Sequence, residues 1–266
     1  IWPLSVIHVP FVVSLVAAPL SLAQTMPQTG PQPGGPQDTT VKDPRSRAKL
    51  HTELGTLYFQ DRNIPVAMEE LTIAIYIDPT YAPAYGMRAL VHNYLREPNH
   101  AEDNFRDALR YAPDDPEIAN NYGWFLCQNG QYKQGLEQLE RALRSRLYQT
   151  PDRAQVNAAQ CAMLMGDMKL AGDYLERAIR YSNAGNMLAL YYRIELYYRT
   201  GRLEAAHAEM AELLRKIDPT SEVLWLALRI DRKLGNKDSE SRYAAQLRRQ
   251  FPASNEYQEL LKGNFE

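Results

Sequence analysis

The chain has 266 residues, of which 30 are Lys or Arg and 32 are Asp or Glu, so its net charge is close to zero. A surface without a charge excess has no general attraction for nucleic acid or anionic lipid, so we expect no nucleic-acid partner. Two cysteines are too few for a scaffold held together by many disulfides. The length exceeds that of a typical single core, but a repeat array has no such limit because each unit packs only on its neighbours.

Residues 1–23 form an apolar run that ends in Ser21-Leu22-Ala23. Small residues at alternate positions suit signal peptidase, so the run predicts a cleaved export signal and a mature chain that begins at Gln24. Three prolines interrupt the run and argue against a lasting transmembrane helix. An uncleaved anchor and a misassigned start are the alternatives.

Residues 24–47 are rich in proline, glycine and glutamine and hold few large apolar side chains. Such a segment cannot bury enough surface to offset the entropy of its chain. We therefore expect a disordered linker, followed by a folded domain at residues 48–266.

From Ala48 onward the chain repeats itself with a period of about 34 residues. Small residues in the repeat let two helices of a hairpin cross closely, and a proline then ends the second helix. This is the tetratricopeptide pattern. In the first two units, the recurring pairs are Gly55 and Ala89, Ala67 and Ala101, Leu71 and Phe105, Ala74 and Ala108, and Pro79 and Pro113.

The pattern predicts an all-α fold, a right-handed superhelix of six tetratricopeptide repeats. The third unit carries about two extra residues around Leu147 to Pro151, and Asn255 to Leu261 predicts a short C-terminal capping helix. The six units lie at about 48–81, 82–115, 116–151, 152–186, 187–220 and 221–254.

In such a stack the first helix of each hairpin lines a concave groove, where we expect a protein partner to bind. Aromatic side chains are enriched in binding hot spots, and amides can pair with a peptide backbone. For the aromatic residues, packing between repeats is an equally good explanation. The predicted binding residues are Asn93, Asn120, Trp124, Gln128, Asn157, Gln160, Tyr191, Tyr198 and Trp225.

Catalytic and metal-binding patterns are absent from the sequence. The five histidines are spread along the chain without a His-x-x-x-His pair, and no glycine-rich phosphate loop accompanies them. Catalysis needs groups that converge on one place. The sequence therefore predicts no enzyme, no cofactor and no metal site.

The array, from Ala48 to about Leu261, resembles the type IV pilus biogenesis and stability tetratricopeptide proteins, PilF or PilW. The stretches that carry the resemblance are Asn120 to Cys127, Leu147 to Pro151, and Asn157 to Cys161. The resemblance implies a periplasmic, pilotin-like scaffold that supports secretin assembly or pilus stability. Its partner would be the outer-membrane secretin or another pilus assembly protein. A general periplasmic adaptor for envelope enzymes or lipoproteins is the alternative.

One feature of the family has no counterpart in this sequence. Its usual members are lipoproteins with a Leu-x-Gly-Cys signal, whereas this sequence reads Leu-Ser-Leu-Ala-Gln at residues 20–24 and has no cysteine before Cys127. The resemblance therefore leaves membrane association open. We expect a periplasmic protein that reaches the inner leaflet of the outer membrane through its partner.

Cys127 and Cys161 lie late on the first helices of adjacent units, and export would place them in an oxidising compartment. We expect a disulfide that joins the third and fourth repeats, with the extra residues of the junction bringing the two positions level. The bridge requires Cα atoms less than about 7 Å apart. The alternative is a pair of buried thiols that pack like small apolar residues.

Overall fold

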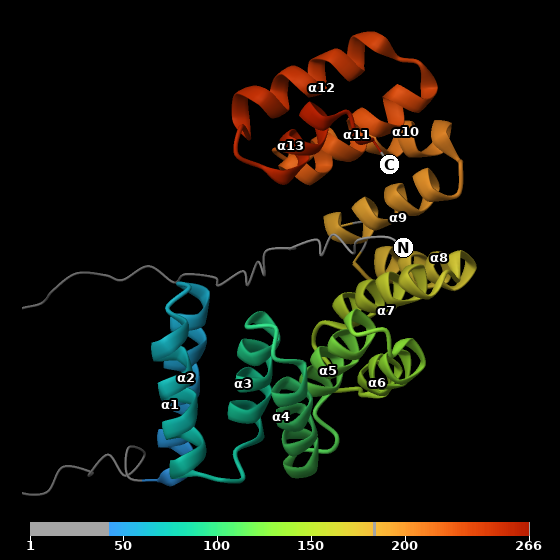
Figure 1. Cartoon of the computed structure of the whole chain (residues 1–266). Helices are drawn as coiled ribbons and strands as arrows, with labels where there is room; N and C mark the ends of the chain where they lie inside the picture. Colours follow the sequence, from blue (N-terminus) through green and yellow to red (C-terminus); the bar gives the residue numbers. More distant parts are fainter. Residues whose placement is uncertain (1–42, 183–184, 266) are drawn as a thin grey trace, which may run out of the picture. The chain divides into compact units, whose positions relative to one another are not determined.

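The computed structural model describes residues 43–182 and 185–265, so the expected signal and most of the expected linker lie outside the described residues. Within these ranges the chain forms helices and no β-strand (Figure 1). None of the described helices is both long and apolar enough to cross a membrane. The helices are α1 Pro44–Gln60, α2 Ile64–Ile77, α3 Ala82–Tyr94, α4 Pro98–Tyr111, α5 Pro116–Gln128, α6 Tyr132–Arg144, α7 Pro151–Met165, α8 Met168–Tyr181, α9 Met187–Arg199, α10 Leu203–Leu214, α11 Ser221–Leu234, α12 Lys237–Gln250 and α13 Asn255–Lys262.

The first twelve helices pair in chain order into six antiparallel hairpins, from α1 with α2 to α11 with α12. The first helices of neighbouring hairpins also contact one another, and α13 packs on α11 and α12. This confirms the predicted all-α tetratricopeptide superhelix of six repeats with a C-terminal capping helix.

Local sequence signals explain where the helices begin and end. Proline occupies the first turn of α1 to α5 and of α7, where its missing N–H costs nothing. Before α5, the carboxylate of Asp115 accepts hydrogen bonds from the N–H groups of Glu117 at 2.9 Å and Ile118 at 3.1 Å. At the other end of a helix, Gly166 closes α7 with a φ of 90°, a left-handed conformation that favours glycine.

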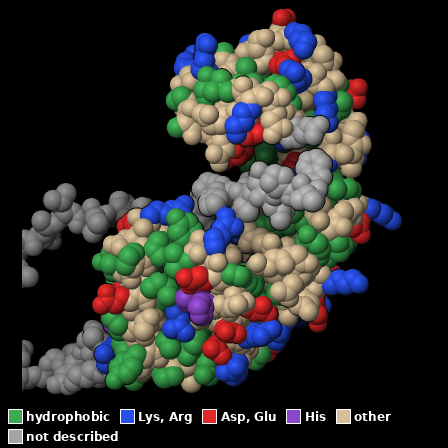
Figure 2. All heavy atoms as spheres, in the orientation of Figure 1, with side chains coloured by type: hydrophobic (Ala, Val, Ile, Leu, Met, Phe, Trp, Pro, Cys, Tyr) green, Lys and Arg blue, Asp and Glu red, His purple; other side chains and the backbone are tan. Residues whose placement is uncertain are grey.

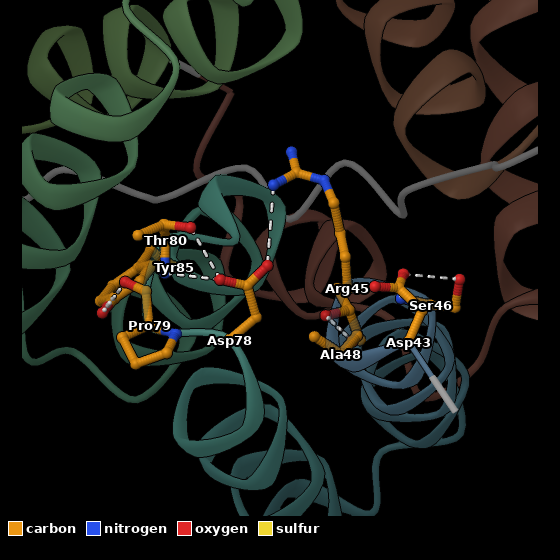
Figure 3. A network of polar contacts seen from close by, with 9 residues as sticks. Asp43, Arg45, Ser46, Ala48, Asp78, Pro79, Thr80 and Tyr85 are labelled. Carbon is orange, nitrogen blue, oxygen red and sulfur yellow. Dashed lines mark hydrogen bonds and ion pairs between the residues drawn. The ribbon is translucent and has the colours of Figure 1, made fainter. Parts of the chain in front are cut away.

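Helix α1 begins at Pro44, earlier than the expected repeat boundary at Ala48, because Asp43 caps it through Ser46 N–H at 2.9 Å. Arg45, in the first turn, reaches Asp78 at 3.6 Å in the turn between α2 and α3 (Figure 3). Asp78 also accepts hydrogen bonds from the N–H of Thr80 at 2.9 Å and its hydroxyl at 2.7 Å. The start of α1 is thus tied to the junction between the first two hairpins.

The two helices of the third hairpin approach each other closely at Gly123 on α5 and Gly135 on α6. A Cβ atom added to Gly135 would lie 2.7 Å from the carbonyl oxygen of Gly123 and would also collide with the sulfur of Cys127. The small residues of the repeat therefore allow this helix crossing, as the sequence pattern predicts.

Basic and acidic side chains are interspersed over the face of the molecule that Figure 2 shows. This mixture agrees with the nearly balanced composition, 30 basic against 32 acidic residues. The face in view has no broad field of a single sign such as nucleic-acid binding would need.

Candidate protein-binding groove

The first helices of the hairpins, α1, α3, α5, α7, α9 and α11, each contact the next first helix in the series. The surface that these six helices share is here termed the inner face. All nine of the predicted binding residues lie on α3, α5, α7, α9 or α11, and they differ in how far they reach the surface.

Trp124 on α5 is half-buried, with part of its side chain packed against the large central core of the third and fourth repeats. Gln128, one helical turn further along α5, is exposed. Gln160, on the neighbouring helix α7, is half-buried. These three residues offer an anchored aromatic surface with one amide on the same helix and one on the next first helix, which suits an apolar side chain and its peptide backbone.

Asn93 on α3 and Gln128 on α5 form an amide pair across two repeats. The Asn93 side-chain N–H donates to the Gln128 carbonyl oxygen at 3.3 Å. Among the described residues, the remaining Asn93 oxygen and Gln128 N–H₂ have no other hydrogen-bond partner. The pair therefore presents an acceptor and N–H donors, the two kinds of group that the N–H and C=O of a peptide residue require.

Asn120 differs from the other predicted amides because it is fully buried. Its oxygen accepts a hydrogen bond from Asn157 on α7 at 2.9 Å, and its N–H₂ donates to Asn121 at 3.2 Å. Arg153 on α7 donates to the same Asn121 oxygen at 3.0 Å. Asn120 thus links α5 to α7 by a hydrogen bond and is not available to a ligand. Asn157, its partner on α7, is half-buried.

Tyr191 on α9 is half-buried, and its ring packs edge to face on Tyr192 with the ring centroids 5.3 Å apart. Burial, reinforced by the nearby Glu195 carboxylate, raises the pKa of the Tyr191 phenol well above its usual value. Tyr191 is therefore a neutral hydroxyl at physiological pH, able to donate a hydrogen bond.

Two of the three aromatic residues predicted in the last two repeats, Tyr198 and Trp225, are buried within the folded chain. Tyr198 is 8% exposed, and its ring lies under the Arg229 guanidinium at 4.9 Å and the Lys233 ammonium at 4.2 Å. Trp225 is 9% exposed and stacks on Phe265, which follows α13, with ring centroids 5.6 Å apart. The accessible part of the predicted site therefore lies on α3, α5 and α7, together with the half-buried Tyr191 on α9.

Cys127 and Cys161 connect α5 to α7 beside this region. The structure pairs them in a disulfide with the Cα atoms 5.4 Å apart, inside the range that such a bridge requires. Both side chains are almost completely buried. The link holds the helices of Trp124 and Gln160 together.

Comparisons with known proteins agree with this architecture. One tetratricopeptide-repeat family model matches residues 104–137, and a second matches residues 126–186 and 173–222. The chain is 28% identical over 210 residues to the type IV pilus assembly protein PilF of Pseudomonas aeruginosa, covering 79% of this chain and 83% of PilF. It is 26% identical over 144 residues to an uncharacterised protein of Haemophilus influenzae, covering 53% of this chain and 79% of that protein.

Two solved structures of pilus proteins superpose on most of the chain. The crystal structure of PilW, described as a widely conserved type IV pilus biogenesis factor, matches with a TM-score of 0.74 at 29% identity and covers 80% of this chain and 98% of PilW. The structure of Pseudomonas aeruginosa PilF matches with a TM-score of 0.69 at 26% identity, covering 83% and 99%. The chain is thus similar to the type IV pilus proteins PilF and PilW, both in sequence and in its tetratricopeptide-repeat fold.

Proposed function

We propose that this chain is a periplasmic scaffold for type IV pilus biogenesis that has no catalytic activity of its own. In this proposal it supports the assembly or stability of the secretin, or the stability of the pilus, by binding a protein partner on its inner face. The observation that carries the proposal is the homology to PilF and PilW, which extends over most of this chain and of both relatives. Association with the outer membrane would come through the partner.

The accessible groups of the inner face suit an extended or helical segment of a protein partner. An apolar side chain of the segment would pack on Trp124, while its backbone pairs with the free oxygen of Asn93 and the free N–H₂ of Gln128. The disulfide between Cys127 and Cys161 supports a location in an oxidising compartment such as the periplasm.

Deletion of the gene tests the proposed function. We expect cells without this protein to lose secretin multimers, surface pili or both, and to regain them when the wild-type gene is supplied. Electrophoresis of unheated envelope extracts measures the multimers, and shearing of cells measures the pili. Unchanged multimers and unchanged pili would contradict the proposal.

Trp124→Ala should weaken binding of the purified periplasmic region of the secretin by about 2 kcal/mol, or roughly thirtyfold in Kd. The reason is that Trp124 is a large, partly accessible aromatic residue one helical turn from Gln128, whose N–H₂ group is free. Calorimetric titration measures the affinity, and circular dichroism shows whether the variant is folded.

Arg141→Ala on α6 is the matched control for this experiment. Arg141 lies on a second helix, away from the inner face, and its contact with Asp114 at 3.8 Å is a surface ion pair of small energetic value. We expect this variant to bind like the wild type. If the wild type and a folded Trp124→Ala variant bind the secretin region with equal affinity, Trp124 is not part of the binding site.

A further inference from the structure

Two histidines and a glutamate converge at the turn between α3 and α4. His92 lies in the last turn of α3, Glu97 directly precedes α4, and His100 lies in the first turn of α4. The Nδ1 atom of His92 is 2.6 Å from Oε2 of Glu97, and Nδ1 of His100 is 3.8 Å from the same oxygen. One ligand atom from each of the three residues fits within a span of 4.8 Å.

The sequence has no His-x-x-x-His pair, and for that reason it predicts no metal site. The informative signal was Glu97-x-x-His100, since residues three apart share one face of a helix. The approach of His92 from the preceding helix depends on the geometry of the turn, which the spacing alone does not reveal.

The backbone of this turn holds the cluster together. The N–H of Glu97 donates to the carbonyl oxygen of His92 at 3.0 Å, and the N–H of Arg96 donates to that of Asn93 at 3.1 Å. Arg96 adopts a left-handed conformation with a φ of 62°. This is the Schellman arrangement, which places the side chains of His92 and Glu97 against each other.

The same turn closes the first helix of every hairpin, so the six repeats can be compared position by position. In the other five hairpins, none of the equivalent sets holds three side chains that commonly bind metals. The three residues are therefore not a requirement of tetratricopeptide packing. The equivalent sets are Tyr58, Asn63 and Val66; Leu126, Gln131 and Gln134; Ala162, Asp167 and Leu170; Tyr197, Arg202 and Ala205; and Asp231, Asn236 and Ser239.

We propose that His92, Glu97 and His100 bind one zinc ion. Two imidazole nitrogens and one carboxylate oxygen are a common zinc ligand set, whereas calcium and magnesium prefer oxygen ligands alone. Zinc bonds of about 2.0–2.2 Å in tetrahedral geometry place ligand atoms about 3.4 Å apart. The His92–Glu97 hydrogen bond must therefore open slightly, while His100 moves closer.

The exposure of the three side chains permits this adjustment. The side chain of His92 is 14% exposed and gives a fixed point, whereas those of Glu97 and His100 are 43% and 70% exposed. The fourth coordination position lies toward solvent, where a water molecule or a donor atom from a partner protein completes the site. The ion would join the end of α3 to the start of α4 and stiffen the second hairpin.

Zinc titration of the full purified chain, freed of any histidine tag and treated with a chelator, tests the proposal. We expect binding of one zinc ion per chain by calorimetry and a higher Tm in the presence of zinc, because zinc binds the folded state. The absorbance spectrum of cobalt(II) bound in place of zinc provides an independent test, because it reports whether the ligands are nitrogen and oxygen atoms. The absence of zinc binding, or binding without a rise in Tm, would overturn the proposal.

Variants assign the site to its residues. His100→Ala, which removes the most exposed ligand, should retain the fold and weaken zinc binding about tenfold or more, as should His92→Ala. His51→Ala is the matched control, because Nδ1 of His51 is also 2.6 Å from a carboxylate oxygen, that of Glu70, but has no second histidine in its set. Zinc affinity that is unchanged in His100→Ala, or equally reduced in His51→Ala, would overturn the assignment.

Discussion

Removal of the disulfide between Cys127 and Cys161 is expected to lower the free energy of unfolding by about 4 kcal/mol in the chain-entropy model. The bridge spans a sequence separation of 34 residues, so breaking it restores considerable freedom to the unfolded chain. Urea denaturation of the oxidised chain and of the Cys127→Ala/Cys161→Ala variant measures the difference. The replacement by alanine avoids placing new hydroxyl groups in two buried positions.

A reducing agent provides the control for this prediction. It should shift the urea midpoint of the wild type toward that of the double variant, and it should leave the double variant unchanged. Thiol titration of the unfolded protein, purified without a reducing agent, should detect no free thiol. Two free thiols per chain would show that the native protein carries buried thiols in place of a bridge.

The position of the bridge predicts how the array unfolds. Each repeat contacts only its neighbours, so the loss of one inter-repeat link weakens the array locally. Because the bridge joins α5 to α7, we expect hydrogen exchange in the double variant to increase first in the third and fourth repeats. An even increase over all six repeats would argue against this local role.

The repeat period predicted the fold because it records a packing requirement that is local in sequence. Ala67, Leu71 and Ala74 recur as Ala101, Phe105 and Ala108, and all six residues are fully buried in the structure. Their spacing depends on the helical period and on the crossing of two adjacent helices, both of which short-range sequence determines.

The candidate site was less predictable because it depends on contacts between repeats. Asn120 and Asn157 are 37 residues apart, and their hydrogen bond depends on the register that the extra residues near Leu147 impose on α7. Helical spacing placed Asn120 on the correct helix but did not reveal its burial. Likewise, nothing in the repeat pattern indicated that Phe265, beyond the last repeat, stacks on Trp225.

Gly135→Ala is expected to destabilise the protein by about 3 kcal/mol, although alanine forms helices better than glycine does. The new methyl group would lie 2.7 Å from the Gly123 carbonyl oxygen and 3.0 Å from the Cys127 backbone nitrogen. Neither backbone atom can move away unless α5 and α6 separate. Urea denaturation measures the loss, and a stability equal to that of the wild type would show that the two helices can separate at little cost.

Gly172→Ala on α8 separates this crowding from the general effect of glycine on a helix. The nearest neighbour of a methyl group there, a side-chain carbon of Leu196, is 3.6 Å away, which is an ordinary contact. This variant should be more stable than the wild type by up to about 1 kcal/mol, because it gains helix propensity without a clash.

In the Cys127→Ala background, Gly135→Ala should lower the free energy of unfolding by less, because the Cys127 sulfur is one of the atoms that the new methyl group meets. The Gly123 carbonyl oxygen should still keep the substitution destabilising. If the destabilisation disappears in that background, the steric clash lies entirely with the Cys127 sulfur and not at the helix crossing.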